Sequence, residues 1–368
     1  MKIKANRKEL AAALKTATVC VQSRAMLPIL NNALFEAADG KLKITCTNLE
    51  QRITATLDAE ATEPGKTTIP AKKLLSLLNA LSPAEVALDC DMENFHTTLS
   101  GGSSKIKLPG LNPQDFPEAS EIERKNVVEM NTADLRSLID RSQYTVSVND
   151  ARKVLRGMYF EASESRISGV GTDGKRCAVS QIDFTPPFEE GFSRILPLAA
   201  VSFLRNVKQD KITLAFDEGK RLVAETGSIV FESKLIEGNY PNWRVIVPKS
   251  FAYRAEIPTA EFLAKLNIAL MIAAAESMYV DLTFRENRLD FHVDSAANGS
   301  ADDSLEIKTE RVGTGDELAL TLNPAMLAGA VKTCGETTFL VEFNDGVSPV
   351  NLDFGNGSFC VMMPIRKK

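Results

Sequence analysis

Residues 197–204 read Pro-Leu-Ala-Ala-Val-Ser-Phe-Leu, a proline followed by an apolar run with helical character. Similar segments begin at Pro70 and at Pro324, and both intervals, 70 to 197 and 197 to 324, measure 127 residues. Proline suits the first position of a helix, where its missing amide proton is not needed. We therefore predict a helix at each proline and a threefold internal repeat of the chain.

A second series of markers keeps nearly the same period. Helical segments are predicted to begin near Asn6, Asn131 and Pro258. Each repeat also has a turn that ends in a proline, at Pro117, Pro241 and Pro364. Solenoid repeats measure about 20 to 50 residues, so a repeat of this length is a whole domain.

The chain of 368 residues is therefore predicted to contain three similar domains, at 1–122, 123–250 and 251–368. Alternating apolar and polar residues predict strands between the helices. These strands are expected at 42–47, 51–57, 104–108, 211–216 and 279–284. Two helices and several antiparallel strands per domain give an α+β fold with the helices on one sheet face.

Composition narrows the class of protein. The six cysteines show no C-x-x-C spacing and no secretory signal precedes them, which favours a cytoplasmic protein with reduced thiols. No apolar run approaches the roughly 20 residues of a membrane-spanning helix. His96 and His292 lie in alternating, strand-like sequence without neighbouring ligands, so we expect strand histidines rather than a metal site.

Charge is distributed unevenly along the chain. The six predicted helices carry a formal charge of +7, whereas the whole chain carries −5, which leaves −12 for the remainder. Lysines and arginines on helices are usually solvated. Their recurrence on equivalent helices instead favours a positive surface that holds a polyanion without reading its sequence, since phosphate contacts carry no base information.

Several motifs, in register with the repeat, resemble one known family. They are Leu-Pro-Ile-Leu at 27–30, Asp-Phe-Pro at 115–117, Gly-Thr-Asp-Gly-Lys-Arg at 171–176, Leu-Ile-Glu-Gly-Asn-Tyr-Pro at 235–241 and Val-Met-Met-Pro-Ile-Arg at 361–366. Over its full length the chain is similar to the bacterial DNA polymerase III beta subunits, the sliding clamps.

This resemblance implies a ring-shaped, head-to-tail homodimer of six domains, with helices lining a hole through which double-stranded DNA passes. It implies a processivity factor that has no catalytic residues, cofactor or metal and that works in the cytoplasm on the nucleoid. The implied partners are the replicative polymerase alpha subunit, the clamp loader delta subunit, repair polymerases, mismatch repair proteins and ligase.

The resemblance also implies a pocket between the second and third domains for peptides that contain glutamine, leucine and phenylalanine. Lys175 and Val245 depart from the histidine and arginine that the resemblance leads us to expect. Carried over by position, the pocket residues are Leu155, Thr172, Gly174, Lys175, Arg176, Cys177, Pro241, Val245, Ile246, Val361, Met362, Met363, Pro364, Ile365 and Arg366.

Two further sets of residues follow from the same resemblance. The expected DNA contacts are Lys8, Lys15, Arg24, Lys72, Lys73, Arg152, Lys153, Arg205 and Lys208. At the dimer joint, Ile106 and Leu108 are expected to meet the partner's Met271 and the partner's Ile272. Lys105 and Lys107 are then expected to face acidic residues, namely Asp302, Asp303 and Glu306 of the partner subunit.

Two alternatives belong to other classes. An enzyme of repeated α+β units, similar to enolpyruvyl transferases, would need convergent catalytic carboxylates, and the sequence shows no acid–base pair at motif spacing. An acidic scaffold that never binds DNA would show no salt-dependent retention on DNA.

Overall fold

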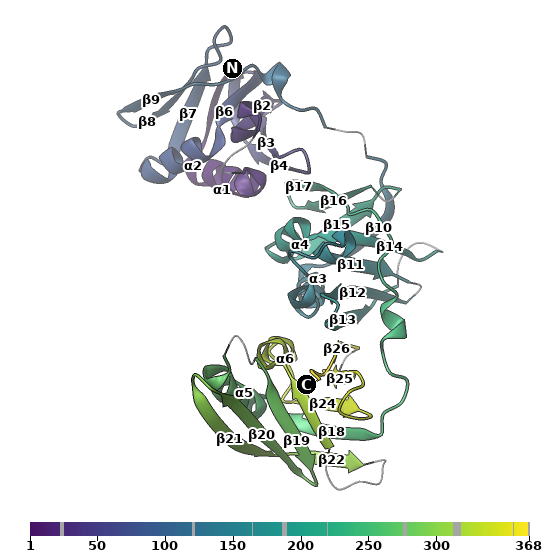
Figure 1. The fold of residues 1–368 in the computed structure, drawn as a ribbon. Helices are drawn as coiled ribbons and strands as arrows, with labels where there is room; N and C mark the ends of the chain where they lie inside the picture. Colours follow the sequence, from purple (N-terminus) through teal and green to yellow (C-terminus); the bar gives the residue numbers. More distant parts are fainter. Residues whose placement is uncertain are drawn as a thin grey trace. The chain divides into compact units, whose positions relative to one another are not determined.

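The protein is described by a computed structural model of residues 1–22, 26–119, 122–163, 165–185, 190–218, 220–274, 278–311, 318–355 and 357–366. Its elements follow one order three times: strand, helix, three strands, strand, helix, three strands (Figure 1). A short additional strand follows the fourth strand in the first and third repeats. The predicted threefold repeat and α+β fold are confirmed.

The three repeats have the following bounds. The first contains β1 (Lys2–Asn6), α1 (Arg7–Ala17), β2 (Asn32–Ala38), β3 (Lys41–Thr47), β4 (Gln51–Asp58), β5 (Glu60–Glu63), β6 (Gly65–Pro70), α2 (Ala71–Ala80), β7 (Glu85–Cys90), β8 (Thr97–Gly101) and β9 (Ser104–Leu108). The second contains β10 (Lys125–Asn131), α3 (Thr132–Asp140), β11 (Gly157–Ala162), β12 (Arg166–Thr172), β13 (Arg176–Asp183), β14 (Phe192–Pro197), α4 (Leu198–Arg205), β15 (Lys211–Phe216), β16 (Arg221–Thr226) and β17 (Ile229–Lys234). The third contains β18 (Tyr253–Pro258), α5 (Thr259–Ile272), β19 (Val280–Arg285), β20 (Arg288–Ser295), β21 (Gly299–Glu306), β22 (Lys308–Arg311), β23 (Leu318–Leu322), α6 (Pro324–Val331), β24 (Thr338–Phe343), β25 (Val350–Asp353) and β26 (Phe359–Met362).

Four antiparallel sheets are built from these strands. Their strand orders are β5-β1-β7-β8-β9, β10-β15-β16-β17-β4-β3-β2-β6, β14-β11-β12-β13-β26-β25-β24-β18-β22 and β21-β20-β19-β23. Two sheets therefore cross from one repeat to the next, where β17 pairs with β4 and where β26 pairs with β13. The strands β9 and β21 each end a sheet.

The chain forms two compact units: residues 1–132 with 206–235, and residues 133–205 with 236–368. The middle repeat is divided between them. Strands β10, β15, β16 and β17 belong to the first unit, and α4 with β11 to β14 belongs to the second.

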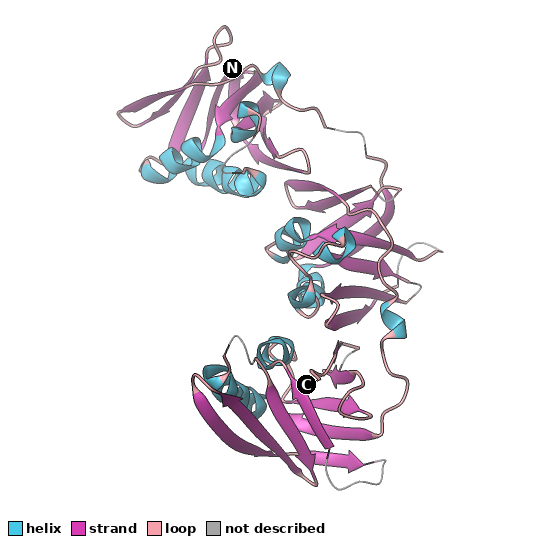
Figure 2. Ribbon diagram, in the orientation of Figure 1, coloured by secondary structure: helices cyan, strands magenta, loops and turns pink. Residues whose placement is uncertain are grey.

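Helices pack on one face of the strands within the repeats (Figure 2). Helix α1 contacts α2 and strands β3 and β4, and its residues Leu10, Leu14 and Ala17 are buried as their helical spacing predicts. Asn6 caps this helix by accepting hydrogen bonds from the amides of Lys8 and Glu9. In the third repeat, α5 contacts α6 and strands β20 and β21.

Three of the marker prolines occupy a different position from the predicted one. Pro70, Pro197 and Pro258 are the last residues of β6, β14 and β18, and the helix begins at the next residue. Pro324 is the first residue of its helix, as predicted, and Asn323 caps that helix. The fixed φ of proline suits an extended residue at a strand end as well as a first helical turn, so the sequence alone did not separate the two positions.

Other sequence features lie as follows. His292 is part of β20, but His96 lies in the loop before β8, so the prediction of a strand at His96 was wrong. Among the described residues, no group of three histidine, cysteine, aspartate or glutamate side chains could hold a metal ion. The described helices are too short or too polar to cross a membrane. All six cysteines are free and buried.

Candidate functional site

A cavity of about 510 Å³ lies within the unit formed by residues 133–205 and 236–368. Its walls come from the 3-10 helix Lys153–Arg156 with its N-cap, the turn between β12 and β13, the segment before β18, the loop after β24, and the end of β26. The lining residues are Arg152, Leu155, Thr172, Gly174, Lys175, Arg176, Cys177, Pro241, Asn242, Trp243, Val245, Ile246, Val247, Pro248, Asn344, Ser348, Pro349, Val361 and Met363.

Large apolar side chains are left exposed at the cavity. Val245 is 77% exposed and Ile246 is 45% exposed, although both are apolar. Met363 is 48% exposed on the wall that follows β26. Exposed apolar side chains that gather around one cavity are typical of a docking surface.

Strand alternation decides which C-terminal residues line the cavity. Val361 and Met363 are two residues apart and both line it, whereas Met362 between them packs into the core of the third repeat. Successive side chains of a strand point to opposite faces, which explains this separation. Met362 therefore does not line the cavity, and the structure gives no support to its expected contact with a peptide.

The last described residues also leave the cavity. Ile365 donates its backbone amide to the carbonyl of Thr321 in β23, at 2.8 Å. Pro364, Ile365 and Arg366 do not line the cavity. The hydrogen bond to β23 holds this segment beside that strand, so these three residues are not part of the cavity wall, and their role in peptide binding stays a prediction.

The turn between β12 and β13 is held by the carboxylate of Asp173. Its Oδ1 accepts the amides of Lys175 and Arg176, each at 3.0 Å, and its Oδ2 accepts the Arg176 Nε at 3.0 Å. Gly174 has a φ of +82°, a left-handed conformation that favours glycine. The carbonyl of Lys175 accepts the amide of Met363 at 3.0 Å, which fixes this turn against the end of β26.

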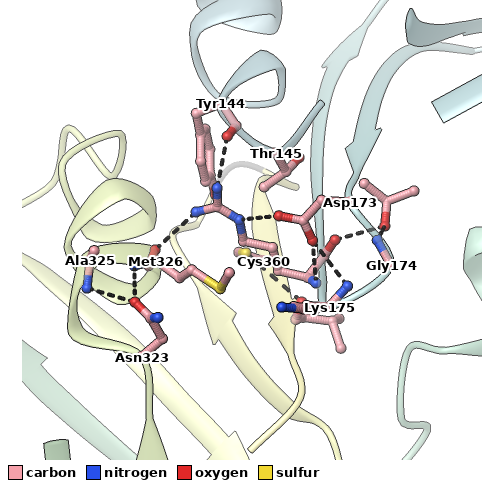
Figure 3. Close-up of polar contacts among 12 residues, drawn as sticks. Tyr144, Thr145, Asp173, Gly174, Lys175, Asn323, Ala325, Met326 and Cys360 are labelled. Atoms are coloured by element: carbon pink, nitrogen blue, oxygen red, sulfur yellow. Dashed lines mark hydrogen bonds and ion pairs between the residues drawn. The ribbon is translucent and has the colours of Figure 1, made fainter. Parts of the chain in front are cut away.

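Arg176 connects this turn to two other elements, and Figure 3 labels its partners Tyr144, Asp173 and Met326. Its Nη2 donates to the carbonyl of Tyr144 in the 3-10 helix Gln143–Thr145, at 3.0 Å, and its Nη1 donates to the carbonyl of Met326 in α6, at 3.3 Å. The guanidinium lies over the Tyr144 ring, with Cζ 5.5 Å from the ring centroid. Because the Arg176 side chain is only 16% exposed, it acts as a partly buried link between the second and third repeats.

Cys177 is part of the cavity wall but is almost fully buried. Burial raises the pKa of the Cys177 thiol to about 12, and burial also raises the pKa of the Cys360 thiol on the neighbouring strand to about 12. Both thiols therefore stay protonated at neutral pH and act as small apolar side chains rather than nucleophiles.

The predicted DNA contacts fall into three groups. Lys8, Lys15, Lys72, Lys73, Lys153 and Lys208 are exposed. Arg205 is paired with Asp140, and Arg152 is paired with Asp150 through Nε and Nη2, each at 3.0 Å, so these two charges are largely compensated. Arg24 lies outside the described residues.

The Arg152–Asp150 pair lowers the pKa of the Asp150 carboxyl group. Hydrogen bonds from the Arg152 side chain and amide hold the pKa of Asp150 at about 2. Arg152 also lines the cavity, a place that the sequence prediction did not give it.

The predicted dimer residues lie on the edge strands β9 and β21 and at the end of helix α5. Lys105 and Lys107 are exposed on β9, but Leu108 is 4% exposed and belongs to the core of its own repeat. On α5, Met271 is 78% exposed while Ile272 packs partly against the core. Leu108 is therefore closed to a second chain, contrary to expectation.

The acidic residues of β21 point to opposite faces. Asp303 accepts Lys265 of α5 at 2.7 Å, and the neighbouring Asp302 accepts His292 of β20 at 2.7 Å. Asp302 and Glu306 share the face away from the helix because they are an even number of residues apart. Lys105 and Lys107 of another strand can meet only one of these faces, so Asp303 does not belong to the same contact.

Comparison with known proteins assigns nearly the whole chain to one family. Three family models match in order: the DNA polymerase III beta subunit N-terminal domain at residues 1–120, its central domain at 129–242 and its C-terminal domain at 244–366. The chain belongs to the DNA polymerase III beta subunit family.

Individual relatives agree with this assignment. The "Beta sliding clamp" of Salmonella typhimurium is 26% identical over 371 residues, which covers 100% of both chains. The crystal structure of the DNA polymerase III subunit beta from Pseudomonas aeruginosa has a TM-score of 0.94 at 22% identity, and that of the DNA polymerase sliding clamp from Bacillus subtilis has a TM-score of 0.94 at 20% identity. Each covers 100% of both chains.

Membership in this family decides between the classes of protein that the sequence left open. DNA polymerase III beta subunits are sliding clamps, non-catalytic processivity factors of DNA replication. The alternative of an enzyme similar to enolpyruvyl transferases is therefore not supported.

Sequence reasoning missed part of the cavity of this beta subunit. Asn242, Trp243, Val247 and Pro248 lie in the segment before β18, and Asn344, Ser348 and Pro349 lie in the loop after β24. The segment carried a usable signal, because Pro241 and Val245 were already assigned and the residues between them continue the same wall. The loop after β24 carried no such signal in the sequence, because it reaches the cavity only in the folded protein.

Proposed function

We propose that this chain is a DNA sliding clamp that closes as a head-to-tail homodimer around double-stranded DNA and binds partner proteins through the cavity. Its domains are proposed to span 1–122, 123–250 and 251–368. The proposed partners are the replicative polymerase alpha subunit, the clamp loader delta subunit, repair polymerases, mismatch repair proteins and ligase. The proposed location is the nucleoid in the cytoplasm.

The observation that carries the proposal is the order of strands at the junctions. The fourth strand of the first repeat, β4, pairs with the last strand of the second, β17. The fourth strand of the second repeat, β13, pairs with the last strand of the third, β26. One fourth strand and one last strand have no such pairing within the chain. They are β21, the fourth strand of the third repeat, and β9, the last strand of the first repeat, and each ends its sheet.

A second copy of the chain completes the pattern. If β21 of one copy pairs with β9 of the next, every junction has the same two strands in the same order. Such a head-to-tail contact generates a ring when the rotation closes. The contact also covers two sheet edges, which would otherwise be free to pair with other proteins.

Charge and apolar surface support this contact. The exposed Lys105 and Lys107 of β9 complement Asp302 and Glu306 on one face of β21. Ile106 points to the face of β9 opposite these lysines. In the proposed contact it meets Met271 of the other copy, which extends from the end of α5 with 78% of its surface exposed. Complementary charges fix the register of such a contact, while apolar burial supplies most of its affinity.

DNA binding is proposed for the exposed lysines of the repeat helices. Lys8 and Lys15 of α1 and Lys72 and Lys73 of α2 extend from helices that contact one another. Lysine contacts to phosphates hold DNA in place without reading its bases, which suits a protein that slides.

Peptide docking is proposed for the cavity because exposed apolar side chains surround it. A peptide that buries a leucine and a phenylalanine there gains about 1.5 to 3 kcal/mol from each side chain. Trp243 lines the cavity and is the only tryptophan of the chain, so its fluorescence reports docking directly.

The experiment that tests docking compares Met363→Ser with the native chain. A peptide with the glutamine, leucine and phenylalanine motif should change the fluorescence of Trp243 in the native protein and bind Met363→Ser at least several-fold more weakly. Met92→Ser, which removes a methionine that is 48% exposed elsewhere, is the matched control and should bind normally. Equal affinity of all three proteins would show that partners dock outside the cavity.

A further inference from the structure

His292 is one of only two histidines in the chain, and it lies beside the edge strand β21. It belongs to β20 and stands directly opposite Asp302 of β21. Its Nδ1 lies 2.7 Å from Oδ1 of Asp302, and the two side chains are 50% and 81% exposed. Because β21 is the last strand of its sheet, Asp302 lies between the imidazole and the open edge.

Strand alternation decides which face of the sheet carries this pair. Phe291, the residue before His292, is buried in the core of the third repeat. Successive side chains of a strand point to opposite faces, so His292 and its partner Asp302 lie on the face away from that core. This is the face on which Asp302 is proposed to meet Lys105 and Lys107 from β9 of a second copy.

Every strand beside the imidazole contributes charged side chains to the same face. These residues are Asp281 and Arg285 in β19, Arg288, Asp290 and Asp294 in β20, and Asp302 and Glu306 in β21. Carboxylates and arginines keep their charges between about pH 5.5 and 8, whereas histidine gains a proton within this range. Among the described residues of this face, His292 is therefore the group whose charge changes near neutral pH.

Protonation of the imidazole alters the charge of the contact without a new geometry. Nδ1 donates to Asp302 both in the neutral ring with its proton on Nδ1 and in the charged ring. In the charged form, however, the carboxylate is compensated by His292 and a further positive charge faces the edge. Neighbouring strands lie about 4.8 Å apart, so β9 as the next strand would bring its lysines within roughly 10 Å of the imidazole.

We propose that His292 makes the joint between copies sensitive to pH, and that the ring is held more weakly when the imidazole is protonated. The proposal rests on the proposed head-to-tail contact between β9 and β21. In that contact the lysines of β9 disfavour the added proton, so the dimer binds it less tightly than the separate chains do. By linkage, the dimer loses stability as the pH falls through the range in which histidine gains its proton.

The test measures the dimer dissociation constant at about pH 8 and about pH 5.5 by sedimentation equilibrium at low salt. One exposed charge interaction changes an equilibrium constant by about 2- to 5-fold. A ring of two chains has two identical joints, so the dissociation constant should be about 4 to 25 times larger at the lower pH. The difference should shrink at high salt, because salt screens exposed charges.

Three variants identify the residue responsible. His292→Gln cannot gain a proton, so its dissociation constant should show no such rise at the lower pH. His292→Lys is charged at both pH values and should dimerise weakly at both. His96→Gln removes the other histidine, which lies in the loop before β8, and should keep the difference of the native chain. A difference that survives in His292→Gln, or that is lost in His96→Gln, would overturn the proposal.

The remaining outcomes separate this proposal from the proposed contact. If the native chain forms no dimer at either pH, the head-to-tail contact is wrong, and the role of His292 falls with it. If the native chain dimerises equally well at both pH values, or more tightly at the lower one, the contact stands and the role of His292 is wrong. Circular dichroism at both pH values should show the same folded chain for the native protein and for His292→Gln, because the imidazole is half-exposed.

Discussion

Arg176 is the residue whose contacts join the second and third repeats most directly. Replacing it by methionine leaves the carbonyls of Tyr144 and Met326 and the carboxylate of Asp173 without their donor. An unpaired buried polar group costs about 1 to 3 kcal/mol, so we expect Arg176→Met to lower the free energy of unfolding by about 2 to 4 kcal/mol. Denaturant unfolding measures this loss.

A matched control is Arg166→Met. Arg166 pairs with Asp183 at 3.3 Å, and their side chains are 53% and 91% exposed. An exposed pair of this kind contributes about 0 to 1 kcal/mol. Similar losses in the two variants would contradict the structural role given to Arg176.

Buried thiols give a prediction about pH. Burial raises the pKa of the thiols of Cys20, Cys177 and Cys360 to about 12. An unfolded cysteine has a pKa of about 8.5, so the folded chain holds protons that the unfolded chain releases. The free energy of unfolding should therefore be unaffected by these thiols below pH 8.5 and should fall as the pH rises from there toward 12.

The slope expected for one such thiol is about 1.4 kcal/mol per pH unit above the unfolded pKa. Urea unfolding of the native chain and of a variant with these three cysteines changed to alanine, each at pH 7 and pH 9.5, isolates this contribution. The native chain should lose more stability between the two pH values than the variant. An equal loss would show that the thiols do not titrate as described.

At the scale of residues, the cavity was expected from the resemblance to the family and not from local pattern. The turn that contains Thr172, Gly174 and Lys175, which the resemblance assigned to a peptide pocket, lines the cavity. The differences from that expectation are at residues whose direction depends on pairing: Met362 points into the core because Val361 faces the cavity, and Arg152 reaches the cavity while bound to Asp150. Neither direction could be predicted before the strand and the ion pair were known.

At the scale of elements, the lysines of α2 carry the proposed DNA contact. Changing Lys72 and Lys73 to glutamate should weaken binding to duplexes of any sequence to the same degree and reduce the salt dependence, because fewer counterions are released from the phosphates. Filter binding over a range of salt concentrations measures both effects.

Lys41 and Lys43 serve as the control, because they carry the same charge on strand β3 of the same repeat. Changing both to glutamate alters the net charge by the same amount as changing Lys72 and Lys73. It should, however, leave most of the salt dependence of DNA binding unchanged. If the strand variant and the helix variant lose affinity equally, the DNA contact does not belong to the helices.

Helix α5 gives a prediction about assembly. Met271→Ala removes an exposed methionine that is proposed to be buried by a second copy, and full burial of such a side chain is worth about 1.5 to 3 kcal/mol. We expect the dimer dissociation constant to rise about 10- to 100-fold, measured by sedimentation equilibrium.

Ile268→Ala is the control on the same helix. Ile268 is 43% exposed and lies one turn before Met271. A smaller change than that of Met271→Ala is expected, since the proposed contact is centred on the end of α5. A native dissociation constant for Met271→Ala would contradict the assignment of this surface.

Much of the arrangement of elements was predictable, and the pairing between repeats was not. Helix markers that recur at intervals of 125 to 127 residues predicted all six helices, because helix signals are local. The pairing of β17 with β4 and of β26 with β13 joins strands far apart in the sequence, and no local pattern specifies it. The sequence therefore predicted three domains but not the two sheets that cross between them.

At the scale of the whole molecule, the account depends on two of the strands that end a sheet, β9 and β21. Two junctions within the chain show which strands join successive repeats, and β9 and β21 are the same strands left without a neighbour in their sheets. A contact between copies that uses them makes a closed ring, and a closed ring holds DNA by topology rather than by affinity. Retention on DNA should then depend on whether the DNA has ends.

The most direct test is retention on circular DNA before and after it is cut. Dissociated protein is concentrated in the presence of nicked circular DNA, the dimer joint is fixed with a zero-length cross-linker between lysines and carboxylates, and the mixture is passed over a sizing column at high salt. The account predicts that protein travels with the circle and is released when a restriction enzyme makes the DNA linear. Protein that remains bound after cutting, or that never stays on the circle, would contradict a clamp that encircles DNA.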